Sequence, residues 1–106
     1  MMFYSKKLRK FKSISHCFFS RKNGFSKGIY RGLNCGKGSK DKKNHIKKNL
    51  NFVAKKIGVK KNKLILMYQT HSAKVIEISK QNFNKKIEAD AMITKMKGVA
   101  LGVVTA

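Results

Sequence analysis

The 106-residue chain contains no proline and no tryptophan, and it has only two cysteines and four acidic residues. It also lacks any apolar run close to the roughly 20 residues that a membrane-spanning helix needs. Cys17 and Cys35 do not form a C-x-x-C spacing, so we expect neither a disulfide framework nor a zinc ribbon. These absences favour a cytoplasmic protein in which both cysteines are reduced, buried side chains.

Charge is the dominant feature that is present, because 26 Lys and Arg residues give a net charge of +22. Such a chain attracts nucleic acid or anionic lipid, so a basic nucleic-acid-binding module is one alternative function. Only Arg9, Arg21 and Arg31, however, offer the planar guanidinium that recognises phosphate and guanine with two hydrogen bonds. The many lysines accompany many Asn and Ile, as A/T-biased coding would produce, and we favour a solvated lysine surface.

The first 40 residues divide into three stretches. Residues 1–12 form a basic lead-in that has the charge of a signal peptide without its apolar run, and residues 13–106 are assigned to a single domain. Residues 13–20 predict a short strand whose end, at Phe18 and Phe19, is buried. Residues 21–40 hold five glycines and predict a long irregular loop, which at this length is functional or disordered.

Helical spacing follows the loop. Apolar residues recur at helical intervals with lysines on the opposite face, at positions Ile46, Leu50, Val53, Ala54 and Ile57. Asp41 is placed to cap the start of this helix, and Gly58 stands where a left-handed C-cap is needed.

Four strands are predicted after the helix, at 64–67, 75–78, 89–94 and 99–105. The first is apolar on both alternating faces, which indicates a strand covered on both sides. The last is apolar up to the chain end, although termini normally lie at the surface. We therefore expect an α/β fold of mixed sheets packed with flanking helices, belonging to a fragment that is truncated within a core strand.

Three residues are candidates for chemistry. His71 lies directly after a predicted buried strand, where a neutral imidazole can reach a cleft and bind a metal, although a single His is more often a surface or hydrogen-bonded residue. Asp90 could be catalytic, or it could accept backbone N–H groups at the start of a strand. Arg21 could contact an anion from its flexible loop, or face solvent.

Several stretches, read in order, resemble the laccase-domain family, also described as polyphenol oxidase-like proteins or multi-specific purine nucleoside phosphorylases. Its members have motifs similar to H-G-F-F-T-R-x-G-G-V-S, L-N-L-G, Q-x-H-G, A-D-A and T-A-D-C. The stretches that carry the resemblance, together with Asp41 and Asn49, are 16–26 (His-Cys-Phe-Phe-Ser-Arg-Lys-Asn-Gly-Phe-Ser), 33–36 (Leu-Asn-Cys-Gly), 69–72 (Gln-Thr-His-Ser), 89–91 (Ala-Asp-Ala) and 104–106 (Val-Thr-Ala).

The resemblance implies a zinc-dependent purine nucleoside phosphorylase acting on adenosine, inosine, guanosine and methylthioadenosine. Adenosine deamination and copper-dependent polyphenol oxidation are alternatives that it also implies. His71 would be a metal ligand and catalytic group, and Arg21 and Asn34 would belong to loops that bind substrate or phosphate. The family's other ligands, a Cys after T-A-D and a later His, have no counterpart in this sequence.

The chain departs from the family pattern at four positions. Cys17 and Asn23 replace glycines, Leu50 stands where Arg is common, and Ser72 follows His71 in place of glycine. Asn23 is a mild change because Asn tolerates a positive φ, whereas the loss of the Arg is expected to alter a polar network. By itself the 106-residue piece is expected to be inactive and poorly stable, since a single His binds zinc weakly.

Overall fold

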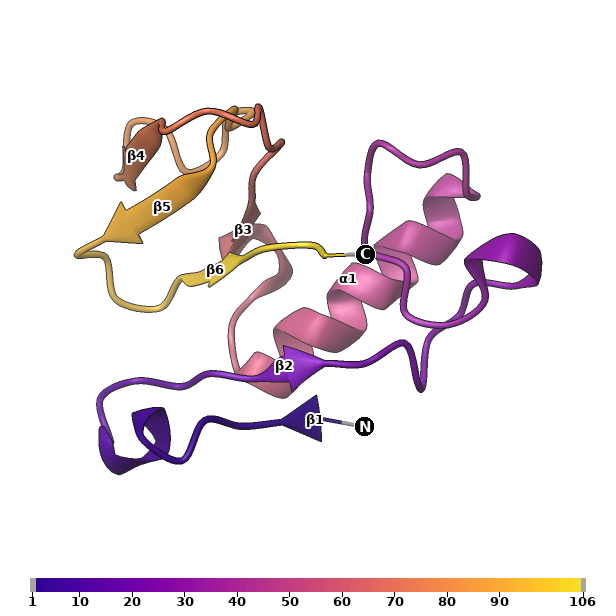
Figure 1. Cartoon of the computed structure of the whole chain (residues 1–106), viewed down its shortest axis with the longest axis horizontal. Helices are drawn as coiled ribbons and strands as arrows, with labels where there is room; N and C mark the ends of the chain where they lie inside the picture. Colours follow the sequence, from indigo (N-terminus) through magenta and orange to yellow (C-terminus); the bar gives the residue numbers. More distant parts are fainter. Residues whose placement is uncertain (1, 106) are drawn as a thin grey trace. The chain divides into compact units, whose positions relative to one another are not determined.

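The computed structural model describes residues 2–105, and the chain divides into two compact units, Met1–Gly58 and Val59–Ala106 (Figure 1). The first contains β1 (Met2–Phe3), β2 (Phe18–Phe19) and α1 (Lys43–Ile57), and the second contains β3 (Leu64–Leu66), β4 (Val75–Ile78), β5 (Ala91–Thr94) and β6 (Ala100–Gly102). Three short 3-10 helices complete the structure: Leu8–Lys10, Gly28–Tyr30 and Lys61–Lys63.

Helix α1 confirms the predicted helix. Its inward face buries Ile46 and Ala54, and between them Asn49. Gly58 ends the helix with φ +90°, and its N–H donates to the carbonyl of Ala54, as a left-handed C-cap does. Apolar spacing and a terminal glycine are local signals, and they sufficed to place this element.

Asp41 does not cap the helix, contrary to prediction. Lys42 occupies the N-cap position without a side-chain hydrogen bond. The carboxylate of Asp41 accepts the N–H of Lys42 at 2.8 Å but is otherwise directed to Ser26 and Asn34 in the preceding loop. The carboxylate of Asp41 therefore accepts hydrogen bonds from the loop, and not from the first turn of the helix as the sequence pattern predicted.

The strand predicted at 13–20 is reduced to β2, which pairs antiparallel with β1. The side chain of Phe18 is 64% exposed, so the prediction that it is buried was wrong, and Phe19 is half-buried. Residues of the basic lead-in thus supply the partner strand for β2. A two-residue ladder has one face open to solvent, which accounts for the exposure of Phe18.

In the second unit, β3 pairs with β6 and β4 pairs with β5, and both pairs are parallel (Figure 1). The helix, the irregular loop and these strands confirm a mixed α/β fold. Between β4 and β5 the chain crosses over through residues 79–90. Ile87 and Ala89 of this crossover form backbone hydrogen bonds with Tyr68, which follows β3. These bonds connect the segment after β3 to the segment before β5.

The four strands predicted after the helix are present, but three of them are shorter than predicted. The strand expected at 64–67 ends at Leu66. The strand expected at 89–94 begins only at Ala91, because the N–H groups of Asp90 and Ala91 both donate to the carbonyl of Lys74. The strand expected at 99–105 is paired only over Ala100–Gly102, and Val103 and Val104 are exposed beyond it. Ala106 lies outside the described residues.

The core of the second unit consists of aliphatic side chains from three strands and the crossover. Ile65 of β3 and Ile78 of β4 are buried with Ile87 and Ala89, and half-buried side chains pack around them: Met67, Ile76, Phe83, Met92 and Met96. Ile65 is buried between two half-buried neighbours, so β3 has the expected apolar character on both faces. The flexible methionines fill the irregular space around this small aliphatic centre.

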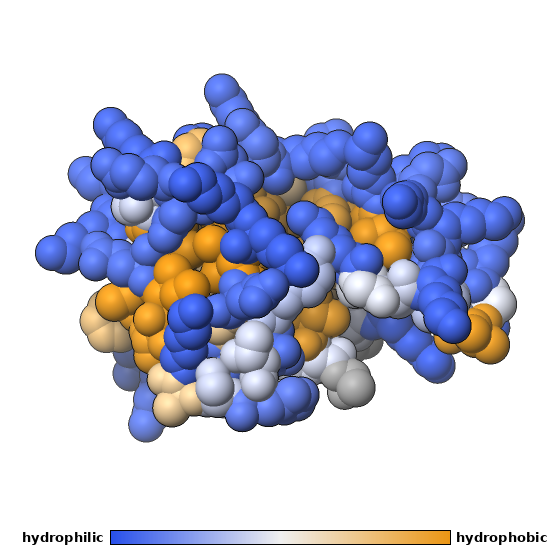
Figure 2. All heavy atoms as spheres, turned by 90° about the horizontal axis from the view of Figure 1, so that it is seen from above, coloured by the Kyte–Doolittle hydropathy of each residue, from blue (hydrophilic) through white to orange (hydrophobic). Residues whose placement is uncertain are grey.

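Basic side chains lie over aromatic rings at five places among residues 2–105. In each, a cationic group is 4.1–5.8 Å from a ring centroid; the pairs are Arg9–Tyr4, Lys48–Phe25, Lys56–Phe52, Lys63–Phe83 and Lys86–Tyr68. Figure 2 shows hydrophilic residues across much of one face with hydrophobic residues visible between them. Lysine stems thus cover apolar surface while their charges stay in water. No helix in residues 2–105 is both long and apolar enough to cross a bilayer.

The glycine-rich loop crosses over itself at Gly24 and Gly32. A Cβ on Gly24 would lie 1.9 Å from the carbonyl carbon of Gly32. Gly32 has φ +114°, and a Cβ there would lie 2.3 Å from the carbonyl oxygen of Arg21. Neighbouring hydrogen bonds join Ser26 to Gly32 in both directions and Leu33 to Arg21. Backbone packs directly on backbone here, so these two positions require glycine.

Replacing Gly24 with alanine is expected to destabilise the first unit by at least about 2 kcal/mol, because the added methyl group has no space and the crossing must open. The measurement is the midpoint of urea unfolding. Gly38→Ala is the matched control, since a Cβ at Gly38 meets no atom within 4 Å. Equal midpoints for the two variants would show that the crossing is not formed.

Candidate functional site

The glycine-rich loop is fixed to α1 by the buried side chain of Asn49, which is 0% exposed. Its Oδ1 accepts the N–H of Phe25 at 2.7 Å. Its Nδ2 donates to the hydroxyl of Ser26 at 2.9 Å and to the carbonyl of Asn34 at 2.8 Å. The side-chain amide of Asn49 thus binds both arms of the loop. The loop's own backbone hydrogen bonds join the two arms only near the Gly24–Gly32 crossing.

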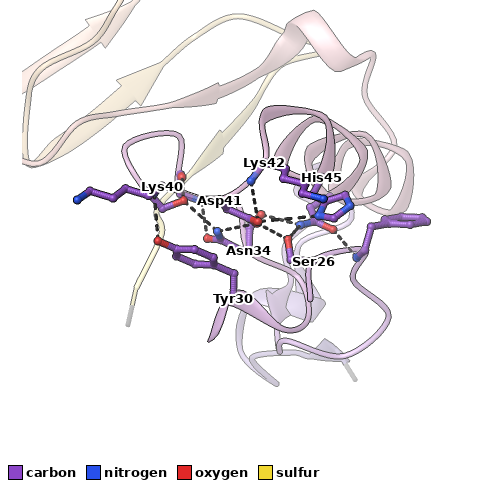
Figure 3. Close-up of polar contacts among 11 residues, drawn as sticks. Ser26, Tyr30, Asn34, Lys40, Asp41, Lys42 and His45 are labelled. Carbon is purple, nitrogen blue, oxygen red and sulfur yellow. Dashed lines mark hydrogen bonds and ion pairs between the residues drawn. The ribbon is translucent and has the colours of Figure 1, made fainter. Parts of the chain in front are cut away.

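Asp41 completes this network from the far end of the loop (Figure 3). The Ser26 hydroxyl donates to its carboxylate, and the Asn34 amide donates to the same oxygen at 3.1 Å. Hydrogen bonding, first from Ser26, lowers the pKa of Asp41 below its usual value, and His45 at 3.9 Å adds a weaker attraction. The carboxylate is therefore ionised at neutral pH and serves as an acceptor for the loop.

Asn34, a predicted substrate contact, has both ends of its amide engaged within the loop. Its Nδ2 also donates to Ser39 at 3.0 Å, and its Oδ1 accepts the N–H of Gly36 at 3.0 Å. No buried side-chain nitrogen or oxygen in residues 2–105 lacks a partner. The network around Asn49 is thus complete with Leu50 in the position where the family pattern commonly has Arg.

Arg21 lines a pocket of about 590 Å³ in the first unit. The lining residues are Arg21, Lys22, Asn23, Gly24, Ser26, Lys27, Gly28, Arg31 and Gly32. Four of these carry positive charge and none carries negative charge. Asn23 has φ +67°, which confirms that Asn replaces glycine here at a position with left-handed backbone. The pocket can attract an anion, and Asn34 does not line it.

The second unit holds His71 on a turn between β3 and β4. Its side chain is exposed, and its backbone has φ +56°, an uncommon conformation for a residue with a Cβ. The turn is bound by Asp90, which accepts the N–H groups of Thr70, His71 and Ser72 at 3.1, 2.9 and 2.7 Å. The hydroxyls of Thr70 and Ser72 donate to the same carboxylate at 2.9 and 2.7 Å.

This geometry decides between the two interpretations of Asp90. The carboxylate accepts backbone N–H groups directly before β5, which is the structural interpretation. Hydrogen bonds, first from the Ser72 hydroxyl and then from the Ser72 N–H, the Thr70 hydroxyl and the His71 N–H, hold the pKa of Asp90 far below its usual range. A carboxylate so stabilised in its ionised form is a poor general base, because a base needs a pKa near the working pH.

The two other histidines have roles within the first unit. The Nε2 of His16 accepts the N–H of Ser5 at 2.7 Å, and His45 lies near Asp41. Within residues 2–105 no three His, Cys, Asp or Glu side chains are grouped so that they could hold a metal ion. The described residues thus supply His71 as a candidate ligand but no complete metal site.

The cysteines are free thiols and half-buried, so the prediction that both are buried was too strong. Burial raises the pKa of the Cys35 thiol to about 11. At neutral pH Cys35 is therefore protonated, and it is a weak nucleophile.

Residue patterns missed Ser26, Thr70 and Ser72 as parts of these networks. Each is a small hydroxyl residue in a loop, and no sequence spacing relates Ser26 to Asp41 or Ser72 to Asp90. A signal was present in the two hydroxyl residues that flank His71. Only the folded chain shows the carboxylate to which they donate.

Known structures share this fold. YlmD from Geobacillus stearothermophilus matches with a TM-score of 0.72 and 23% identity over 81% of this chain. A Neisseria meningitidis protein matches with a TM-score of 0.75 and 27% identity over 85%, and the hypothetical protein YfiH of Bacillus licheniformis with 0.74 and 19% over 81%. No curated protein matches the chain. The chain spans about a third of the length of these solved structures.

The chain therefore has the α/β fold of these solved structures. The family model described as multi-copper polyphenol oxidoreductase laccase matches residues 15–106. The chain belongs to this family.

Asn49→Ala is expected to destabilise the first unit by roughly 2 to 3 kcal/mol, because it leaves the N–H of Phe25 and the carbonyl of Asn34 without their partner. Asn51→Ala, an exposed position on the same helix, is the control and should change stability by less than about 0.5 kcal/mol. Urea unfolding of both variants provides the comparison. A loss of similar size in both variants would contradict the role given to Asn49, because alanine has the higher helix propensity and propensity alone would stabilise α1.

Cys35 is expected to react with iodoacetamide at pH 8 at least tenfold more slowly in the folded chain than in urea, because its pKa of about 11 leaves little thiolate. A Cys17→Ser variant isolates the signal of Cys35, and mass spectrometry follows alkylation. Rates that match in the folded and unfolded chains would contradict the burial of Cys35.

Proposed function

We propose that a protein of the length of the solved relatives, carrying this chain, is a zinc-dependent purine nucleoside phosphorylase. Its substrates would be adenosine, inosine, guanosine and methylthioadenosine, with adenosine deamination as a further activity. Phosphate would attack the anomeric carbon of the ribose, so that a C–O bond forms as the C–N bond to the base breaks. The presentation of His71 on a fixed turn, within a chain of this family, carries the proposal.

His71 suits the role of a metal ligand for two reasons. Its imidazole is exposed, so it can approach a metal without first being uncovered. Its backbone is held by the carboxylate of Asp90, so the direction of the side chain is limited before a metal binds. When bound, zinc would supply Lewis acidity and polarise a bound oxygen.

We propose that the remaining ligands come from the part of such a longer protein that this chain does not include. The described residues offer no group of three candidate ligands, whereas a zinc site uses three or four protein ligands. This division agrees with a chain that spans about a third of the solved relatives. Zinc bound through one imidazole would be weak and would be lost readily to a chelator.

Arg21 is proposed as a phosphate contact. Its pocket contains three further cations and the open backbone of Gly28, and it has no acidic lining that would repel an anion. A guanidinium can bind two phosphate oxygens at once, which a lysine cannot do in the same geometry. Asn34 would support binding from the same loop by keeping its arms joined through Ser39 and Asp41.

Copper-dependent polyphenol oxidation is the second candidate, because the matching family model is described as a multi-copper polyphenol oxidoreductase laccase. Copper sites of the electron-transfer type use a cysteine thiolate together with histidines. Burial raises the pKa of Cys35 to about 11, so a copper ion bound there would have to displace the thiol proton. Metal identity is open to direct measurement.

Nucleic-acid binding and a cytoplasmic location stay predictions. The cation–π pairs engage five basic residues with aromatic rings, and those rings are then less available for stacking with bases. A salt titration against random DNA tests the binding module. Tight, steeply salt-dependent binding that survives His71→Ala would favour it over the enzyme.

The test of the enzyme uses the longer protein, with its reading frame continued to the length of the relatives. Bound zinc is measured by metal analysis, and phosphate-dependent release of hypoxanthine from inosine is followed by chromatography. We expect His71→Ala to lower both by at least about tenfold, since it removes a metal ligand. Arg21→Lys is expected to raise the KM for phosphate several-fold with zinc content unchanged.

Two results would contradict this assignment. Equal activity and zinc content in His71→Ala would remove the role given to His71. Bound copper with oxidation of phenols, and no phosphorolysis, would favour the second candidate.

A further inference from the structure

The turn that carries His71 is built around one carboxylate, that of Asp90. Asp90 accepts three consecutive N–H groups and two hydroxyls, all from residues 70–72. Three successive N–H groups point the same way only when the backbone curls around a common acceptor. Without the Asp90 carboxylate, the N–H groups of residues 70–72 would lose the acceptor to which they donate.

The conformation of His71 makes that acceptor necessary. At φ +56° its Cβ is close to backbone atoms, a cost of roughly 1 to 2 kcal/mol for a residue that is neither Gly nor Asn. Such a conformation persists only where surrounding contacts hold it. At His71 itself this contact is the hydrogen bond from its N–H to the carboxylate of Asp90, at 2.9 Å.

The backbone of Asp90 binds the other end of the same connection. Its N–H donates to the carbonyl of Lys74 at 3.0 Å, and the N–H of Ala91 donates to the same carbonyl at 3.2 Å. Lys74 directly precedes β4, and Ala91 begins β5. The whole loop from Thr70 to Lys74 is therefore fastened to the start of β5, the strand paired with β4.

We propose that Asp90 is a positioning residue that holds His71 in its left-handed conformation and so fixes the direction from which the imidazole reaches its metal. The proposal rests on the proposed role of His71. Asp90 itself does not touch the metal, because its two oxygens are committed to the turn. Ser72 takes part through both its N–H and its hydroxyl, which a glycine at this position could not do.

Asp90→Asn is the decisive variant. It keeps the size of the side chain but replaces one acceptor oxygen with an NH₂ group. In one orientation of the amide this group would face the N–H groups of Thr70 and His71, and in the other it would face the Thr70 hydroxyl and both donors of Ser72. Glu88→Gln is the matched control, because it also removes one negative charge two residues away, from an exposed side chain paired with Lys86 at 3.3 Å.

The first measurement is made on the 106-residue chain without metal. Nuclear magnetic resonance gives the φ of His71 from its three-bond coupling and chemical shifts, and hydrogen exchange gives the protection of the His71 and Ser72 amides. In Asp90→Asn we expect at least tenfold faster exchange at both amides and loss of the positive φ. Glu88→Gln should leave both values unchanged.

The second measurement separates positioning from general stability. In the longer protein, zinc affinity is measured by competition with a chelator, and the urea midpoint of each variant is recorded beside it. We expect Asp90→Asn to weaken zinc binding about tenfold, as loss of a group that orients a metal ligand does. Urea midpoints identify any part of that change that reflects unfolding.

Each outcome is decisive. A positive φ and unchanged exchange in Asp90→Asn would overturn the proposal. A loosened turn with unchanged zinc affinity, while His71→Ala abolishes zinc binding, would also overturn it. If His71→Ala leaves zinc unaffected, the proposed function fails, and the claim that Asp90 orients a metal ligand fails with it. The first measurement would then still report whether Asp90 holds the turn.

Discussion

In the first unit, a single buried side-chain amide connects the glycine-rich loop to the helix. Asn49 lies on the inward face of α1, where an aliphatic residue would ordinarily be found, and it binds the glycine-rich loop at Phe25, Ser26 and Asn34. A loop of this length has little apolar surface with which to order itself. Hydrogen bonds from the helix, together with the loop's own backbone hydrogen bonds near the Gly24–Gly32 crossing, hold the segment that lines the basic pocket around Arg21.

In the second unit, too, a polar side chain holds irregular backbone in place. There a carboxylate at the start of a strand collects the N–H groups of a turn, and the turn carries the side chain that matters. In both units a short polar side chain fixes irregular backbone: Asn49 does so from within α1, and Asp90 from the position directly before β5. Binding residues can then lie on loops without the loops being disordered.

Local signals in the sequence predicted α1, its end at Gly58 and the presence of four strands after it. They also placed His71 after a strand and offered backbone binding as one role for Asp90. Strand lengths and the partners of Asp41 could not be predicted, because pairing and hydrogen bonding join residues far apart in the chain. Phe18 shows the same limit: a hydrophobic residue in a strand is buried only if something covers it.

The parallel pairing of β3 with β6 affects how the chain is made. Strand β3 is synthesised well before β6, and the whole β4–β5 crossover must be produced between them. During that interval the edge of β3 that will receive β6 has no partner, and its side chains are apolar. Unpaired apolar edges of this kind bind other chains. The fold therefore leaves the apolar edge of β3 open to other chains whenever β6 is not in place.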